Sequence, residues 1–196
     1  MTRRKTMQFK TADLLSTLLF ATFITLAAGA HAEDIDSLVD QAGVYTLTNL
    51  HPDPNRNKLY SVNFQQPGLI PLCTEVEITK AGSRKVMFKI KDSGMEYKYL
   101  NHKTAGEDLK TNALRYFGKE CVKDKVAKLS AKDQEGISQG KALVGMSKQG
   151  VIYAIGYPPL GATPSTDATT WKYWFNRFNT FTVTFGADGI VTQVVN

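Results

Sequence analysis

The chain has 196 residues, of which 24 are basic and 18 are acidic, for a formal net charge of +6. The first 32 residues hold four of the basic residues and one acidic residue, which leaves 20 against 17 and a net charge of +3 for the rest. A charge this small argues against a nucleic-acid partner, and the high isoelectric point is partly a property of the N-terminal segment.

Residues 1–32 have the order of a secretory signal peptide. Basic residues at positions 3–5 precede an apolar run, Leu14–Ala28, and Gly29–Ala32 contains the A-x-A pattern that signal peptidase cleaves. The apolar run is about 15 residues long, whereas a membrane-spanning helix needs roughly 20. We expect cleavage before Glu33, no lipid anchor because the site lacks a lipobox cysteine, and no transmembrane segment in the mature chain. An uncleaved N-terminal anchor is the alternative.

The mature chain contains two cysteines, Cys73 and Cys121. Exported proteins enter an oxidising compartment, where paired thiols persist as disulfides. We therefore expect one disulfide between Cys73 and Cys121. Two buried free thiols are the alternative.

The first predicted elements are short strands. Residues 44–100 alternate between apolar and polar positions, and turn sequences rich in Pro, Gly, Asp and Ser separate the runs. Five such runs at this spacing predict a small antiparallel barrel or a strongly bent sheet. An apolar residue then recurs at every fourth position from Leu109 to Cys121, which predicts a helix. We expect these elements to form a first domain, residues 33–128.

The last predicted elements are two helices and three strands. A short helix is expected at residues 137–144, and Ser147 is a favourable N-cap for a second helix, which Gly156 ends. A loop rich in Gly, Pro, Ser and Thr follows, Pro159–Thr170. The three strand-like runs that close the chain are residues 171–175, 178–185 and 190–195, with turns at Asn176-Arg177 and Asp188-Gly189.

The mature sequence has no arrangement typical of catalysis or of metal binding. His51 and His102 lie at turns, away from any cysteine or carboxylate at metal-ligand spacing, and we expect both to be solvated. We expect carboxylate pairs such as Asp133 and Glu135 to lie on solvated faces of the protein. The usual nucleophile, zinc and phosphate-binding motifs do not occur in the sequence. The sequence therefore predicts a protein that is not an enzyme and needs no metal or cofactor.

Seven aromatic side chains occur within residues 171–185. Strand alternation places Trp174 on the face opposite Trp171, so Trp174 is exposed if the Trp171 face packs on the helices. An exposed Trp near an arginine is typical of a recognition surface. A Trp174 buried against the first domain is the alternative. The candidate binding surface consists of Tyr157, Pro158, Pro159, Pro164, Trp174, Asn176, Arg177 and Asn179.

Four short motifs follow one another in the last third of the chain. They are Gly145–Val151, Ile155–Pro158, Trp171–Trp174 and Phe185–Val191. Their order and spacing resemble the BamE-like (SmpA/OmlA) domain family over roughly residues 130–196. The resemblance implies an α-α-β-β-β fold and an envelope protein that binds other proteins without catalytic residues. Residues 44–101 are similar in pattern to the small Src-homology-type barrels of bacterial envelope proteins.

The sequence thus predicts an α+β protein, with a β-barrel domain at residues 33–128 and a BamE-like domain at residues 129–196. We expect it to be periplasmic or secreted and to bind another envelope or secreted protein, in outer-membrane assembly or maintenance. A proteinaceous inhibitor of a secreted or periplasmic enzyme is the alternative.

Overall fold

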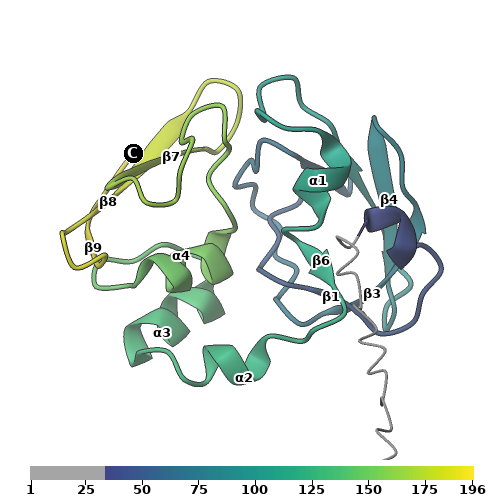
Figure 1. Cartoon of the computed structure of the whole chain (residues 1–196), viewed down its shortest axis with the longest axis horizontal. Coiled ribbons are helices and arrows are strands. Elements are labelled where there is room, and N and C mark those ends of the chain that lie inside the picture. The colour runs from purple at the N-terminus through teal and green to yellow at the C-terminus, as the bar shows by residue number, and fades with distance from the viewer. Residues whose placement is uncertain (1–33) are drawn as a thin grey trace, which may run out of the picture. The chain divides into compact units, whose positions relative to one another are not determined.

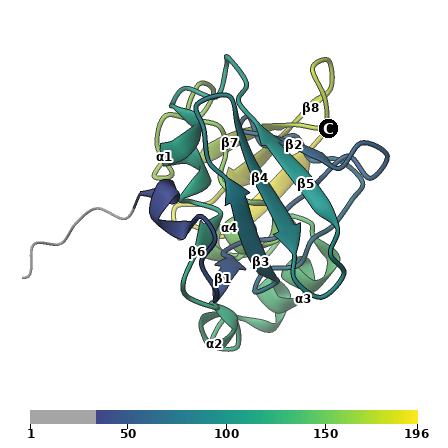
Figure 2. The same ribbon diagram turned by 90° about the vertical axis from the view of Figure 1, so that its right-hand side faces the viewer.

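A six-stranded sheet forms the first half of the computed structural model, which describes residues 34–196 (Figures 1 and 2). Its strands are β1 (Val44–Thr46), β2 (Lys58–Tyr60), β3 (Glu75–Lys80), β4 (Lys85–Ile90), β5 (Glu96–Leu100) and β6 (Phe117–Gly118). Their order in the sheet is β2-β5-β4-β3-β1-β6. All neighbours pair antiparallel except β2 and β5, which are parallel. The predicted signal peptide and the expected N-terminus at Glu33 lie outside the described residues.

The first core lies on one face of this sheet. In β3 and β4, the side chains of Val76, Ile78, Val86 and Phe88 are buried, as the period-two pattern predicts. Ile78 and Phe88 are direct cross-strand partners, so they pack on the same face. A short 3-10 helix (Ile35–Leu38) and helix α1 (Leu109–Ala113) contribute further buried side chains to this core.

The helix predicted from Leu109 to Cys121 is wrong beyond its first five residues. Helix α1 begins at an Asp108 cap, whose carboxylate accepts from Thr111 N at 3.0 Å, and it ends at Ala113. The chain then forms β6, in which Phe117 pairs with Thr46 of β1. The Phe117 ring is 1% exposed and lies 4.9 Å from the Phe88 ring. Burial against the sheet therefore outweighs the four-residue spacing.

The second half contains two main helices and a three-stranded sheet. A short helix, α2 (Lys123–Val126), leads into α3 (Ala131–Gln139) and α4 (Lys148–Ile155). Strands β7 (Thr170–Trp174), β8 (Thr180–Phe185) and β9 (Val191–Val195) then pair antiparallel in that order. The α+β class and the expected α-α-β-β-β order are confirmed. Within residues 34–196, no helix is both long enough and apolar enough to cross a membrane.

The helix boundaries follow from their caps. Ser147 Oγ accepts from Gly150 N at 3.0 Å, which confirms the predicted cap of α4, and Gly156 ends α4 with φ 75°. Helix α3 begins at Ala131 and not at residue 137, because Ser130 Oγ accepts from Asp133 N at 3.1 Å. The helix predicted at residues 137–144 therefore lies nearer the N-terminus, at Ala131–Gln139.

Two glycines allow helix α3 to pack closely: Gly150 of α4 lies against α3, and Gly136 of α3 lies against the residue that precedes the α4 cap. A Cβ atom on Gly150 would overlap the Asp133 carboxylate, and one on Gly136 would overlap the Met146 side chain. The Asp133 carboxylate is buried and accepts from Ser147 N at 2.7 Å, so the prediction that Asp133 is solvated is wrong. This close packing presents the apolar sides of both helices to the three-stranded sheet.

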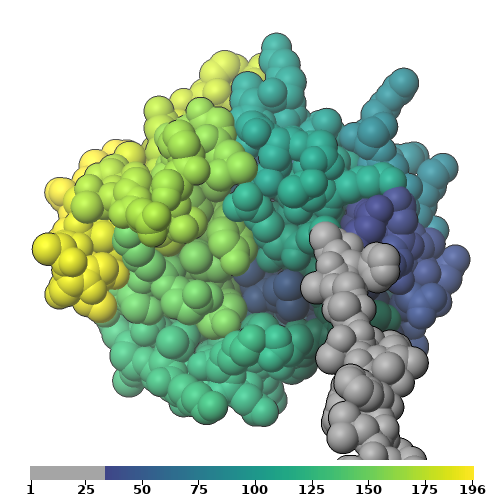
Figure 3. Space-filling view, viewed as in Figure 1, coloured from purple at the N-terminus to yellow at the C-terminus, as the bar shows by residue number. Residues whose placement is uncertain are grey.

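The second core lies between these helices and the sheet. Its largest members are Trp171 and Tyr173 of β7, both fully buried, which pack with side chains of α4 and β8. The Tyr173 ring stacks on Phe181 with centroids 5.3 Å apart. Tyr157 is half-buried and touches both cores. The described residues belong to one compact unit, and the space-filling view shows the two halves in contact (Figure 3).

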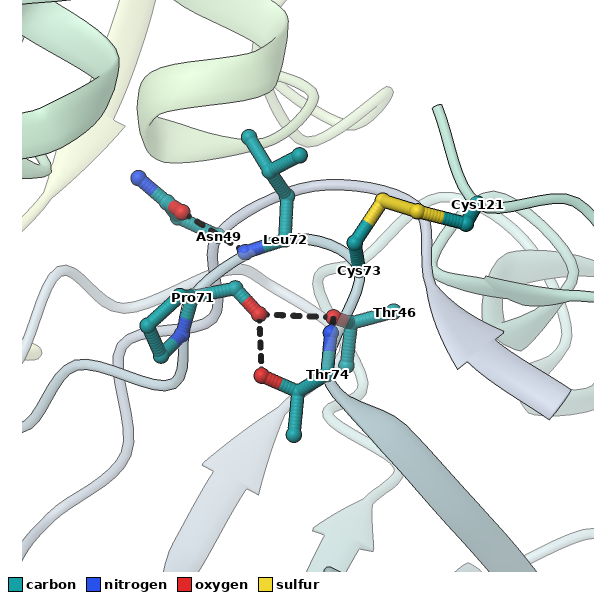
Figure 4. Close-up of a disulfide and its surroundings, with 7 residues drawn as sticks. All are labelled: Thr46, Asn49, Pro71, Leu72, Cys73, Thr74 and Cys121. Atoms are coloured by element: carbon teal, nitrogen blue, oxygen red, sulfur yellow. Dashed lines mark hydrogen bonds between the residues drawn. A yellow bond between two sulfur atoms is a disulfide. The ribbon is translucent and has the colours of Figure 1, made fainter. Parts of the chain in front are cut away.

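The predicted disulfide between Cys73 and Cys121 is present, with Cα atoms 4.9 Å apart (Figure 4). Cys121 follows β6 and does not lie on a helix, in contrast to the predicted position. Beside the bridge, the Pro71 carbonyl accepts from Thr46 Oγ1 at 2.8 Å and from Thr74 Oγ1 at 2.6 Å. The bridge ties the turn before β3 to the chain after β6, and the Thr46 hydrogen bond ties the same turn to the end of β1.

Candidate binding groove at the junction of the two halves

The end of helix α4 is bonded to side chains from the first half. The last carbonyls of a helix have no partner within the helix. Asn49 Nδ2 donates to Ala154 O at 3.1 Å and to Ile137 O at 2.7 Å, and Asn49 N donates to Tyr153 O at 2.9 Å. Asn49 Oδ1 accepts from Leu72 N at 2.9 Å (Figure 4). The Asn49 amide therefore has partners for both its donors and its acceptor.

Two further side-chain amides donate hydrogen bonds to carbonyls at this end of α4. Asn63 Nδ2 donates to Ile155 O and to Tyr157 O, each at 2.8 Å. Gln65 Nε2 donates to Ile155 O at 2.9 Å. Residues 49–65 of the first half thus cap a helix of the second half, and this fixes how the two halves meet.

His51 belongs to the same junction, and the prediction that it is a solvated turn histidine is wrong. Its side chain is buried, and Nε2 lies 3.2 Å from Ala154 O. Burial lowers the pKa of the His51 imidazole, and it outweighs the Ala154 and Gln66 carbonyls, which favour the protonated ring. His51 is therefore a neutral structural group near neutral pH.

A groove of about 560 Å³ opens beside this junction, where β7 meets the chain after β2. Both halves supply its walls. The residues that line this Trp174 groove are Val62, Phe64, His102, Thr104, Gly161, Ala162, Lys172, Trp174 and Arg177.

Trp174 is held in place by its backbone. It forms a bridge with Phe64, and Gln65 N donates to Trp174 O at 2.8 Å. Because Trp171 and Tyr173 face the second core, alternation turns Trp174 to the other face of β7. The Trp174 side chain is half-buried and belongs to neither core. Its position lies between the two alternatives that the sequence left open.

The charges of the groove are positive. Lys172 Nζ lies 5.4 Å from the centroid of the Trp174 ring, and Arg177 Cζ lies 4.4 Å from that of Phe178. Among the described residues, neither Lys172 nor Arg177 forms an ion pair. No carboxylate occurs among the nine described residues that line the groove.

His102 also lines the groove and is only half-buried. Its ring packs edge-on against Phe64, with centroids 5.5 Å apart, and its Nδ1 lies 2.8 Å from Thr104 Oγ1. Burial lowers the pKa of His102, and the positive charge of Lys103 adds to the effect. In residues 34–196, no group of three His, Cys, Asp or Glu side chains is placed to hold a metal ion.

The structure separates the predicted surface residues into three groups. Trp174 and Arg177 come together in the Trp174 groove. Pro158 and Pro159 are buried, which removes both from the candidate surface. The chain forms a tight turn directly after them, in which Ala162 N and Thr163 N donate to Pro159 O at 3.0 and 2.9 Å.

The other predicted residues lie outside the groove. Tyr157 is half-buried beneath Arg115, whose Cζ is 5.3 Å from the ring centroid. Pro164, Asn176 and Asn179 are exposed. Asn176 shapes the turn before β8, because its Oδ1 accepts from Phe178 N at 2.9 Å and from Asn179 N at 3.1 Å.

Sequence reasoning missed most of the groove wall. Lys172 could have been found, since it shares a strand face with Trp174. Phe64 and His102 carry no local signal, because they reach Trp174 only through the tertiary pairing of the two halves.

Comparison of the chain with protein-family models, with curated proteins and with solved structures found no match. The resemblance to BamE-like domains rests on the sequence motifs and stays a prediction.

Proposed function

We propose that this protein is an exported, non-catalytic binding protein of the bacterial envelope that holds a partner protein in the Trp174 groove. The observation that carries the proposal is the half-buried Trp174, which lines a groove together with Lys172 and Arg177 and with residues of the first half. Trp and Arg are the side chains that most often dominate the energy of protein interfaces. A site built on strand ends that are cross-linked by hydrogen bonds is also preorganised, which lowers the entropic cost of binding.

The expected cellular setting has two supports. The N-terminal sequence has the pattern of a secretory signal. The Cys73–Cys121 disulfide is typical of proteins that reside in an oxidising compartment such as the periplasm. The BamE-like motifs favour outer-membrane assembly or maintenance as the process.

The groove chemistry favours binding over catalysis. His102 is hydrogen-bonded to Thr104, a neighbour in the same turn. A nucleophile–histidine pair that works in catalysis needs a third group to orient the imidazole. None of the described residues that line the groove is a carboxylate that could do so.

Site-specific photo-crosslinking tests the proposal. A photoreactive residue at Thr104, which is exposed and lines the groove, should form an adduct with a partner in intact envelopes. The same residue at Met95, exposed on the first half, is the matched control. We expect an adduct specific to position 104 that disappears when Trp174→Ala is added.

Equal adducts from both positions, or an adduct that survives Trp174→Ala in a folded protein, would contradict the proposal. The identity of the captured protein also separates the two candidate roles. An assembly protein supports envelope maintenance, and a hydrolase whose activity falls on binding supports an inhibitor.

A further inference from the structure

We infer that the Trp174 groove selects an acidic segment of its partner, an extended peptide in which carboxylates flank an apolar side chain. The inference rests on the proposed function and names the chemistry of the ligand.

The first argument is charge complementarity. Lys172, Arg177 and His102 are the ionisable groups that line the groove, and Lys103 adjoins it. Seven lysines and arginines of the described chain pair with carboxylates, as Lys91 does with Glu75 at 2.6 Å, and neither Lys172 nor Arg177 is among them. A groove with one sign of charge and low-dielectric walls concentrates its field, so it attracts ligands of the opposite sign.

The second argument is how the two cations are held. The Lys172 ammonium is placed over the Trp174 ring, and the Arg177 guanidinium lies over the Phe178 ring. A cation held on an aromatic face is oriented without being neutralised. Both groups therefore keep their charge for a ligand carboxylate, and Arg177 can bind one in a bidentate fashion.

The third argument is the apolar part of the lining. Val62, Phe64 and Trp174 supply apolar surface, and Gly161 and Ala162 add little side-chain bulk to the lining. The backbone of Gly161 is fixed by its N–H, which donates to Ala105 O at 3.2 Å. This lining suits an apolar side chain on an extended chain, whereas a small inorganic anion would leave the aromatic surface unused.

Fluorescence anisotropy with defined peptides tests the inference. The probe is a fluorescein-labelled heptapeptide, Glu-Asp-Glu-Phe-Asp-Glu-Asp, and its matched control replaces each acid by its amide. We expect the acidic probe to bind at least about tenfold more tightly than the amide control. The affinity should also fall as salt is raised from about 50 to about 300 mM, because the exposed charges are screened.

Variants assign the binding to the groove. Lys172→Gln and Arg177→Gln should each weaken the acidic probe about three- to tenfold, with little effect on the amide control. Lys128→Gln changes an exposed lysine outside the groove and should leave both affinities unchanged.

Several results of these binding measurements would overturn the inference. Equal binding of the two peptides, no binding of the acidic peptide, or equal losses in all three lysine and arginine variants would exclude an acidic-segment site in this groove. Heparin that displaces the probe and binds more tightly in a groove-dependent way would indicate a general polyanion site instead. If only this inference is wrong, the Trp174-dependent adduct at position 104 still forms. If that adduct does not form, the proposed function itself is wrong.

Discussion

The Asn49 side chain joins the two halves, because its Nδ2 donates both to Ala154 O at 3.1 Å and to Ile137 O at 2.7 Å. Asn49→Asp would replace this donor with a negative charge at the C-terminal end of α4, where the helix dipole is also negative. We expect the free energy of unfolding to fall by about 3–5 kcal/mol, since a buried charge would face carbonyls. Urea denaturation measures this.

Asn55 offers a control for that substitution, because it is exposed in a turn. Asn55→Asp should change the free energy of unfolding by no more than about 0.5 kcal/mol. Equal effects of the two substitutions would mean that Asn49 does not hold the junction.

The Cys73–Cys121 bridge spans 48 residues of sequence. In the chain-entropy model a loop of this length stabilises the folded state by about 4 kcal/mol. We expect the double variant Cys73→Ser/Cys121→Ser to lose about this amount in chemical denaturation. Dithiothreitol should destabilise the natural chain to the same degree and leave the double variant unchanged. A reducing agent that affects both proteins equally would speak against this account.

Stability should depend on pH through His51. Its pKa is lowered in the folded state by burial, so the unfolded chain binds more protons once the pH falls below about 6.5. The free energy of unfolding should therefore decrease as the pH is lowered from 7 toward 5. His51→Gln should flatten this slope in urea denaturation at a series of pH values. Folding also lowers the pKa values of Glu75, Asp108 and Glu135. Since carboxyl groups ordinarily titrate below about pH 5, these three residues affect the free energy of unfolding at lower pH than His51 does.

His102 provides the comparison, since its pKa is lowered in the same direction but the ring is less buried. His102→Gln should leave most of the slope between pH 7 and 5 intact. A slope that vanishes with His102→Gln and persists with His51→Gln would reverse this assignment.

Gly150 is required by the contact between α3 and α4. In an open helix, Gly→Ala stabilises by about 1 kcal/mol. Here the added Cβ would overlap the Asp133 carboxylate, so we expect Gly150→Ala to destabilise by about 1–3 kcal/mol. Gln149→Ala, on the exposed side of the same helix, should be close to neutral. Thermal unfolding of the two variants compares them, and a stabilised Gly150→Ala protein would refute the packing described.

The two tryptophans should differ in what their loss does. Trp171 is fully buried, and Trp171→Ala should cost about 3–5 kcal/mol. Trp174 is half-buried outside both cores, and Trp174→Ala should cost about 1–2 kcal/mol while it abolishes capture of the partner. Calorimetry and the crosslinking assay report these two effects separately. A collapse of stability in Trp174→Ala would make it a core residue.

Local chemistry accounts for what the sequence predicted correctly. Alternation in β3 and β4, the Ser147 cap and the Gly156 stop each depend on residues within a few positions of one another. The disulfide was predictable because the expected export implies an oxidising compartment, and because two cysteines allow only one bridge.

Long-range packing accounts for what the sequence did not reveal. Phe117 leaves the helical pattern because β1 and Phe88 bury it. His51 is buried by the end of α4, a helix far along the chain. The groove could not be predicted from the sequence for the same reason, since Trp174 pairs with Phe64 only where the two halves pack together.

The hydrogen bonds at the end of α4 also bear on how cooperatively the chain unfolds. Their donors, Asn49, Asn63 and Gln65, belong to the first half, and the carbonyls that accept them belong to the second half. If one half unfolded alone, the other would lose all of these hydrogen-bond partners at once. We therefore expect the two halves to unfold together, in a single cooperative transition.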